Sequence, residues 1–152
     1  MALECEQSGM YVQAVKLYES CLAGVHANDP KILFALGQAL LFSKRYADAK
    51  ERVRQLTELH RAYKRDETKL LLARILEGEG DMAGAIRHFE ELVPTYAGLE
   101  AKYRYGLHLK SIGHTKHADS VFRELIDHAR RFKINHEEEM QWVKLARRNL
   151  SA

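Results

Sequence analysis

Two stretches of the chain decide its fold: Gly80-Asp81-Met82-Ala83-Gly84-Ala85-Ile86-Arg87-His88-Phe89 and Gly113-His114-Thr115-Lys116-His117-Ala118-Asp119-Ser120-Val121-Phe122. Each has a glycine, then an alanine five residues later, then a phenylalanine four residues after that. A leucine follows three residues further on, and the spacing i, i+4, i+7 places all three side chains on one helix face. We therefore expect the glycine to end one helix and the following residues to form a second, half-buried helix.

The same pattern occurs twice more, at residues 9–18 and 44–53. Its four alanines, Ala14, Ala49, Ala85 and Ala118, are 35, 36 and 33 residues apart. A large residue followed by a small one precedes three of the turns, in the pairs Leu36-Gly37, Leu72-Ala73 and Tyr105-Gly106. Each period is thus predicted to be a helical hairpin with one apolar face, which only stacking against neighbouring hairpins can bury.

A period near 34 residues with this small–large–small pattern resembles the tetratricopeptide repeat. The resemblance implies an all-α, right-handed superhelical solenoid of helix hairpins with a C-terminal capping helix. It covers residues 1–152 as a single domain, with repeats at about 1–28, 29–64, 66–97 and 99–130 and the capping helix at about 136–150. Lys44 stands where a turn glycine is usual, and Thr115 where an aromatic residue is usual.

The two ends of the chain differ. Glu137-Glu138-Glu139 and Arg147-Arg148 match the dipole of a closing helix that carries Trp142. At the other end the first helix of repeat 1 is short by about six residues, so we expect the sequence to be a piece of a longer protein. The chain is similar to the C-terminal part of small bacterial repeat proteins, some of which carry an N-terminal membrane hairpin. That similarity implies a cytoplasmic segment, tethered to the inner membrane if such a hairpin precedes it.

The composition of the chain argues against some classes of partner. Apolar residues make up 46% of the 152, charged residues 30%, and the net charge is +3. The basic residues are scattered among acidic ones, which argues against a nucleic-acid partner. No run approaches the roughly 20 apolar residues of a membrane span, so this segment is expected to make no direct membrane contact. Cys5 and Cys21 fall at core positions of helices and are interpreted as buried thiols rather than a disulfide.

We find no pattern that indicates an enzyme, a cofactor or a metal site. His114 and His117 flank one predicted turn, but zinc needs three or four ligands and only Asp119 is near. Two alternatives to a binding module stay open. One is a ligand- or metal-binding protein or enzyme with an unrecognised site. The other is a structural repeat that associates with itself as a homo-oligomer.

The resemblance also implies a binding groove lined by the first helix of each repeat, for a peptide or helix of a protein partner. The corresponding positions, with one neighbour, are Phe34, Gln38, Leu41, Phe42, Leu70, Arg74, Glu77, Tyr103, Leu107 and Lys110. We expect the apolar members to form an exposed patch and Arg74 and Lys110 to hold an acidic group. The alternative is that Phe34, Leu41 and Leu70 complete internal packing or contact the segment missing from repeat 1.

Overall fold

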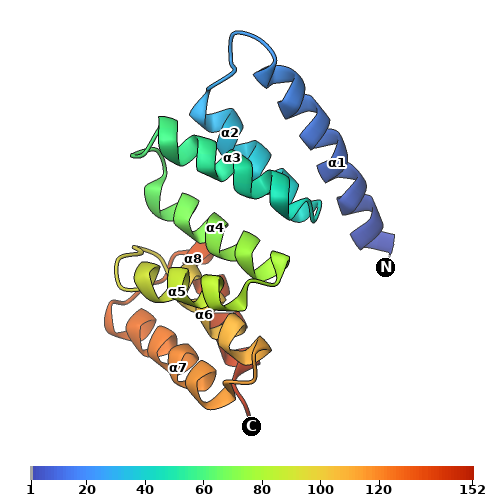
Figure 1. Ribbon diagram of the computed structural model, residues 1–152. Coiled ribbons are helices and arrows are strands. Elements are labelled where there is room, and N and C mark those ends of the chain that lie inside the picture. The colour runs from blue at the N-terminus through green and yellow to red at the C-terminus, as the bar shows by residue number, and fades with distance from the viewer. Residues whose placement is uncertain (1) are drawn as a thin grey trace. The chain divides into compact units, whose positions relative to one another are not determined.

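The computed structural model describes the backbone of residues 2–152 and the side chains of residues 8–152. Within that range the chain forms eight helices and no strand (Figure 1). The helices are α1 (Ala2–Leu22), α2 (Pro30–Phe42), α3 (Tyr46–Leu59), α4 (Arg65–Glu79), α5 (Met82–Leu92), α6 (Glu100–Ser111), α7 (Thr115–Arg131) and α8 (Glu137–Asn149). The predicted all-α class is confirmed. None of the described helices is both long enough and apolar enough to span a bilayer.

The contacts divide the chain into two compact units, an N-terminal unit (Met1–Asp81) and a C-terminal unit (Met82–Ala152). Helix α4 is the last of the N-terminal unit and α5 the first of the C-terminal unit. The two helices predicted for repeat 3 therefore belong to different units. The single domain and the handedness of the superhelix remain predictions.

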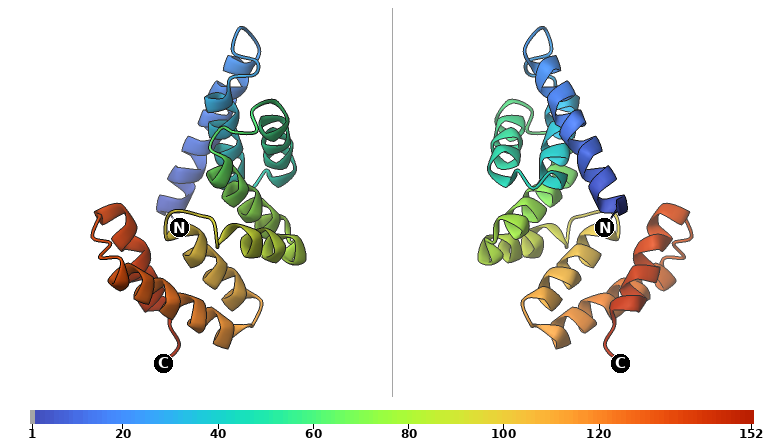
Figure 2. Two further views of the ribbon diagram at one scale, coloured as in Figure 1. Left: turned by 90° about the vertical axis from the view of Figure 1, so that its left-hand side faces the viewer. Right: turned by 90° about the vertical axis from the view of Figure 1, so that its right-hand side faces the viewer.

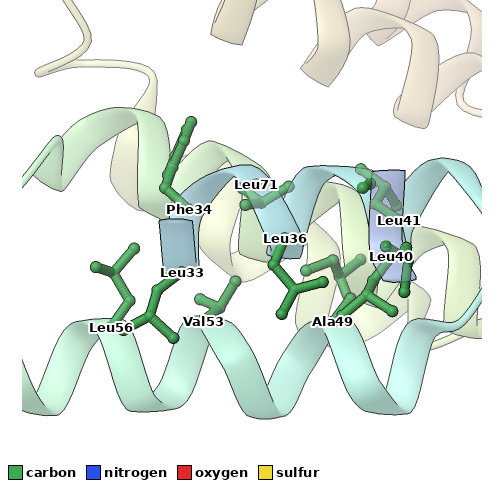
Figure 3. Close-up of a cluster of buried hydrophobic side chains, with 12 residues drawn as sticks. Leu33, Phe34, Leu36, Leu40, Leu41, Ala49, Val53, Leu56 and Leu71 are labelled. Atoms are coloured by element: carbon green, nitrogen blue, oxygen red, sulfur yellow. The ribbon is translucent and has the colours of Figure 1, made fainter. Parts of the chain in front are cut away.

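In the N-terminal unit, α2 and α3 form the predicted hairpin of repeat 2. Leucines 33, 36 and 40 of α2 point toward α3, which meets them with the repeat residues Ala49, Val53 and Leu56 (Figure 3). All six are at most 2% exposed. The i, i+4, i+7 spacing read from the sequence is therefore the buried face of α3.

Local signals set the ends of these helices. The Asp29 carboxylate accepts the backbone N–H of Lys31 at 2.8 Å, and Pro30 occupies the first turn of α2. Lys44, before α3, adopts φ 58°, the left-handed conformation that Gly80 and Gly113 adopt at φ 92° and 85° in the equivalent turns. A lysine there costs roughly 1–2 kcal/mol relative to glycine, which the buried α2–α3 interface offsets.

The predicted turn in repeat 1 is wrong. We expected Gly9 to separate two helices, but α1 runs without a break from Ala2 to Leu22. A glycine inside a helix costs only about 1 kcal/mol. A first helix of about eight residues would be too short to be stable without a partner, so one continuous helix is favoured. Cys21 is a free, half-buried thiol, and the side chain of Cys5 lies outside the described residues.

The C-terminal unit contains the hairpin of repeat 4, α6 and α7, with α5 and α8 packed against it. Phe122 of α7 is fully buried, and a Cβ added at Gly106 of α6 would lie 2.5 Å from its ring. This close approach explains the small residue in the Tyr105-Gly106 pair.

Helix α8 packs on α7 and α6, as α4 packs on α3 and α2. Val143 and Ala146 are the buried residues of α8. The Glu139 carboxylate accepts the backbone N–H of Leu99 at 2.7 Å and so caps the start of α6. Within the C-terminal unit, α8 therefore takes the place that the first helix of a further repeat would take.

Candidate interaction surfaces

The predicted groove residues fall into two sets. Seven lie in the N-terminal unit, on a surface we call the α2–α4 face: Phe34, Gln38, Leu41, Phe42, Leu70, Arg74 and Glu77. The other three, Tyr103, Leu107 and Lys110, lie on α6 of the C-terminal unit. Each set is described within its own unit, and a single groove formed by both stays a prediction.

The expected exposure of the apolar residues on the α2–α4 face is wrong for three of them. Phe34, Leu41 and Leu70 are only 8%, 8% and 5% exposed. The Tyr63 and Phe34 rings pack edge to face with their centres 6.4 Å apart, and the Lys64 ammonium lies 4.9 Å from the centre of the Phe34 ring. Both contacting residues belong to the connection between α3 and α4, which the sequence pattern did not place beside α2.

Gln38 and Phe42 remain exposed on the α2–α4 face, Phe42 at 41%. The Phe42 ring stacks on Tyr11 of α1 with ring centres 4.7 Å apart. The guanidinium of Arg74, from α4, lies 5.3 Å from the centre of the same ring. Three helices thus hold one solvent-accessible aromatic ring in a fixed orientation.

Tyr11 is a member of this cluster that the sequence reasoning missed. It occupies the same repeat position as Tyr46, which packs against the core of the N-terminal unit. The repeat position alone could therefore have indicated a buried contact for Tyr11. It could not have shown that this contact would be made with Phe42.

In the C-terminal unit the chain's own last helix covers much of the predicted set. Tyr103 is 6% exposed, and its ring centre lies 5.4 Å from that of Trp142 in α8. The Lys110 ammonium donates to the backbone carbonyl of Asn149 at 2.8 Å. Leu107 is half-buried. The expected exposure of Tyr103 is therefore also wrong, because α8 packs on the positions that the resemblance assigned to a partner.

Several titratable side chains line a pocket of about 480 Å³ in the C-terminal unit. His117, Glu124 and His128 of α7 line it together with Lys102 and Tyr105 of α6. The Lys102 ammonium lies 3.8 Å from a Glu124 carboxylate oxygen. This pocket is where an unrecognised ligand site would be sought.

One of these residues, Tyr105, supplies no general base to the pocket. Burial, with the nearby Glu90 carboxylate, raises the pKa of Tyr105 to about 12, and its hydroxyl donates to Glu90 at 3.2 Å. A phenol with that pKa stays protonated at neutral pH and is no general base. Among residues 8–152 no three His, Cys, Asp or Glu side chains lie close enough together to hold a metal ion, the turn with His114 and His117 included.

A second hollow, of about 720 Å³, lies between α3 and α4 in the N-terminal unit. Val53 and Leu72 are among the apolar residues that line it, and its charged residues are largely paired. Arg54 bonds to Glu51 and Glu58, and the ammonium of Lys50 lies 2.6 Å from a Glu79 carboxylate oxygen. Paired charges of this kind on exposed helix surfaces contribute little to stability.

Comparisons with known proteins agree with the helical pattern. Residues 7–75 match the tetratricopeptide repeat family. None of the curated proteins matches the sequence. Solved structures share the fold at low sequence identity. A Podosopora anserina protein with nearly identical TPR-like repeats, provisionally assigned as a kinesin light chain, is 17% identical with a TM-score of 0.72. That match covers 98% of this chain and 81% of the other.

Two further structures are similar over most of the chain. MamA is 18% identical with a TM-score of 0.63, over 95% of this chain and 91% of MamA. YrrB, described as a TPR protein with an unusual peptide-binding site, is 16% identical with a TM-score of 0.57, over 95% of this chain and 80% of YrrB. Residues 7–75, a little under half of the chain, thus match the tetratricopeptide repeat family, and the whole chain has the all-α helical-repeat fold of these solved structures.

Proposed function

We propose that this protein is a non-catalytic interaction module that binds a peptide or helix of a partner protein through the α2–α4 face. Proteins built from tetratricopeptide repeats commonly bind proteins or peptides and generally act as scaffolds, which supports this class of function. Apart from Glu77, the residues of the α2–α4 face lie within the part of the chain that matches the family.

The observation that carries the proposal is the Phe42 ring. It is 41% exposed although it stacks on Tyr11 and lies beside Arg74. A ring already held in place loses little conformational freedom when a partner covers it. Aromatic residues and arginine are also enriched among the residues that dominate protein–protein binding energies.

Arg74 and Gln38 determine which partner the face would accept. Arg74 places a positive charge beside the aromatic ring, and Gln38 adds an exposed amide one helical turn before Phe42. Guanidinium groups bind carboxylates through charge-assisted hydrogen bonds. The partner segment is therefore expected to present an apolar side chain to Phe42 and an Asp, Glu or terminal carboxylate to Arg74.

The decisive experiment selects peptides against the wild-type protein from a displayed library and then compares affinities for Phe42→Ser and Phe132→Ser. Phe132, in the C-terminal unit, is 63% exposed and provides a matched loss of an exposed aromatic ring. We expect Phe42→Ser to weaken binding by about tenfold or more, equivalent to about 1.4 kcal/mol, and Phe132→Ser to change it little. Selected peptides that bind all three proteins equally would refute the α2–α4 face as the site.

A further inference from the structure

The pocket of about 480 Å³ in the C-terminal unit lies where the connection between α5 and α6 passes beside the α6–α7 hairpin, and we call it the α6–α7 pocket. Both views of Figure 2 show this hairpin and the connection that leads into the start of α6. Sites for small molecules usually have volumes of roughly 300–1,000 Å³. The α6–α7 pocket is therefore large enough to hold a small ligand.

Part of the α6–α7 pocket is apolar. Its apolar lining comes from both the connection and the hairpin and consists of Val93, Pro94, Ala97, Leu99 and Val121. Leu99 and Val121 are only 3% and 5% exposed, so they belong to the core as well as to the pocket wall. The rings of Tyr105 and His117 also line it and meet edge to face, with their centres 5.8 Å apart. Such a wall suits an aliphatic or aromatic group.

The polar part of the pocket contains a largely buried ammonium group. The Lys102 side chain is 25% exposed, and its nearest carboxylate oxygen, on Glu124, lies 3.8 Å away. That distance is too long for a hydrogen bond. Within residues 8–152 no backbone or side-chain group accepts a hydrogen bond from this ammonium. Its three donors are therefore available to a group that enters the pocket.

Positive charge is in excess around Lys102. A smaller hollow of about 250 Å³ shares Lys102 and Glu124 with the pocket and adds Asp127 and Arg131. The Asp127 carboxylate is already paired with Arg130 at 2.7 Å. No described carboxylate forms an ion pair with Arg131. Three basic side chains thus stand beside two carboxylates, which leaves one positive charge uncompensated.

One uncompensated charge favours one kind of anion. A carboxylate carries a single negative charge and forms charge-assisted hydrogen bonds with ammonium and guanidinium groups. A phosphate monoester carries a charge of about −1.5 to −2 at pH 7. Its additional negative charge would lie close to Glu124 and Asp127, where like charges repel. The charge balance therefore points to a carboxylate rather than a phosphate.

We propose that the α6–α7 pocket binds a small carboxylate that has an aliphatic or aromatic body. The ligand carboxylate takes the place of the Glu124 carboxylate beside Lys102, and the body of the ligand packs on Leu99 and Val121. Glu124 can turn into water because its side chain is 64% exposed. The pocket lies outside the α2–α4 face, so either proposal can fail without the other.

Titrations of the full chain with benzoate, 3-phenylpropionate and octanoate, each compared with its primary amide, test the proposal. Amide chemical shifts of the protein in nuclear magnetic resonance spectra measure the affinities. Each pair of probes has the same body and differs in the negative charge. We expect at least one carboxylate to bind with a dissociation constant of about 1 mM or lower and its amide to bind at least about tenfold more weakly.

Three variants test the position of the site. Lys102→Met should weaken carboxylate binding by about tenfold or more, whereas Lys144→Met should change it less than about twofold. Lys144 is exposed on α8 and does not line the pocket, so it is the matched loss of one positive charge. Glu124→Gln should strengthen carboxylate binding by about threefold or more and leave amide binding unchanged, because it removes the competing charge. Circular dichroism confirms folding, and the exposed Glu124 keeps the test valid if Lys102→Met does not fold.

Four results would overturn the proposal. None of the three carboxylates could bind, or the amides could bind as tightly as the carboxylates. Binding could also be the same in Lys102→Met and Lys144→Met, or in Glu124→Gln and the wild type, which would place the carboxylate elsewhere. The fourth concerns N-acetyl-Gly-Gly-Phe, a peptide whose last residue contains the 3-phenylpropionate skeleton. If it binds at least tenfold more tightly than every small carboxylate, the occupant is the end of a protein chain and not a small ligand.

Discussion

At the scale of single residues, one glycine position of the repeat is packed more tightly in one hairpin than in the other. Gly37 and Gly106 hold equivalent places in α2 and α6. A Cβ at Gly37 would lie 3.3 Å from the Leu71 side chain, whereas one at Gly106 would lie 2.5 Å from the ring of the fully buried Phe122. The first contact needs a shift of a few tenths of an ångström, and the second needs the core to move.

We therefore predict that Gly106→Ala lowers the free energy of unfolding by about 1–3 kcal/mol through overpacking, even after the gain of up to about 1 kcal/mol in helix propensity. Gly37→Ala should change the same quantity by less than about 1 kcal/mol, because propensity and crowding nearly cancel. Urea unfolding followed by circular dichroism measures both. Equal effects of the two substitutions would show that Phe122 does not pack on Gly106 as described.

Tyr105 gives a prediction about pH. Burial and the Glu90 carboxylate raise the pKa of this phenol from its ordinary value of 10.0 to about 12 in the folded protein. The folded state thus disfavours the phenolate, so this contribution to stability is complete below pH 10 and is lost as the pH rises from 10 towards 12. Glu90→Gln removes the charge but not the burial, and should lower the pKa of Tyr105 while leaving it raised.

The ultraviolet absorbance of tyrosinate measures this titration, with Tyr105→Phe identifying the late-titrating step among the seven tyrosines. A late step that persists in Tyr105→Phe would belong to another tyrosine. An unchanged midpoint in Glu90→Gln would exclude the carboxylate as a cause.

At the scale of helices, the repeat pattern located most elements and failed at α1. Seven of the eight helices lie where the hairpins or the capping helix were predicted, because their apolar spacing and turn signals agree. In α1 the glycine signal at Gly9 indicated a turn, but only a weak penalty opposes continuing the helix through it. A turn glycine is decisive only when a second helix packs back onto the first.

The contact between α8 and the start of α6 gives a prediction at this scale. The Glu139 carboxylate accepts the Leu99 N–H, whereas Glu138, also in the first turn of α8, is exposed. Glu139→Ala should lower the free energy of unfolding by about 1.5–3 kcal/mol, the usual contribution of a hydrogen bond to a charged group. Glu138→Ala should lower the free energy of unfolding by only a few tenths of a kcal/mol, which is what an acidic residue contributes near a helix start. Urea unfolding compares them, and equal losses would mean that the cap does not stabilise the fold.

At the scale of the whole molecule, each compact unit has its own buried centre. Leu33, Leu36 and Val53 belong to the core of the N-terminal unit, while Phe89 and Phe122 are completely buried in the C-terminal unit. We predict that residues 82–152 expressed alone form a helical unit with a cooperative urea transition, because domains of about 55–65 residues can already fold alone. Circular dichroism measures this. A fragment without a transition would show that the core of residues 82–152 needs the first 81 residues. That result is expected if the whole chain is a single repeat domain.

The proposed binding surface also belongs to this scale, since it combines residues from several helices. Phe42, Tyr11 and Arg74 come from α2, α1 and α4. The sequence placed Phe42 and Arg74 in a groove by analogy. It left the burial of Phe34 and Leu41 open, and it did not predict that Tyr63 and Lys64 would cover Phe34 or that α8 would cover Tyr103. Burial depends on side chains far away in sequence, which a periodic pattern does not specify.

The sequence by itself determined the all-α class, the hairpins of repeats 2 and 4, the closing helix and the buried signature residues such as Ala49, Val53 and Phe122. It could do so because those features depend on helix periodicity and on turns only a few residues long. Only the tertiary structure decided that α1 is unbroken, that α8 covers Tyr103, and that Met10 and Leu17 remain exposed. The physical reason is that exposure depends on which helices pack together, and the energy of that packing comes from residues distant in sequence.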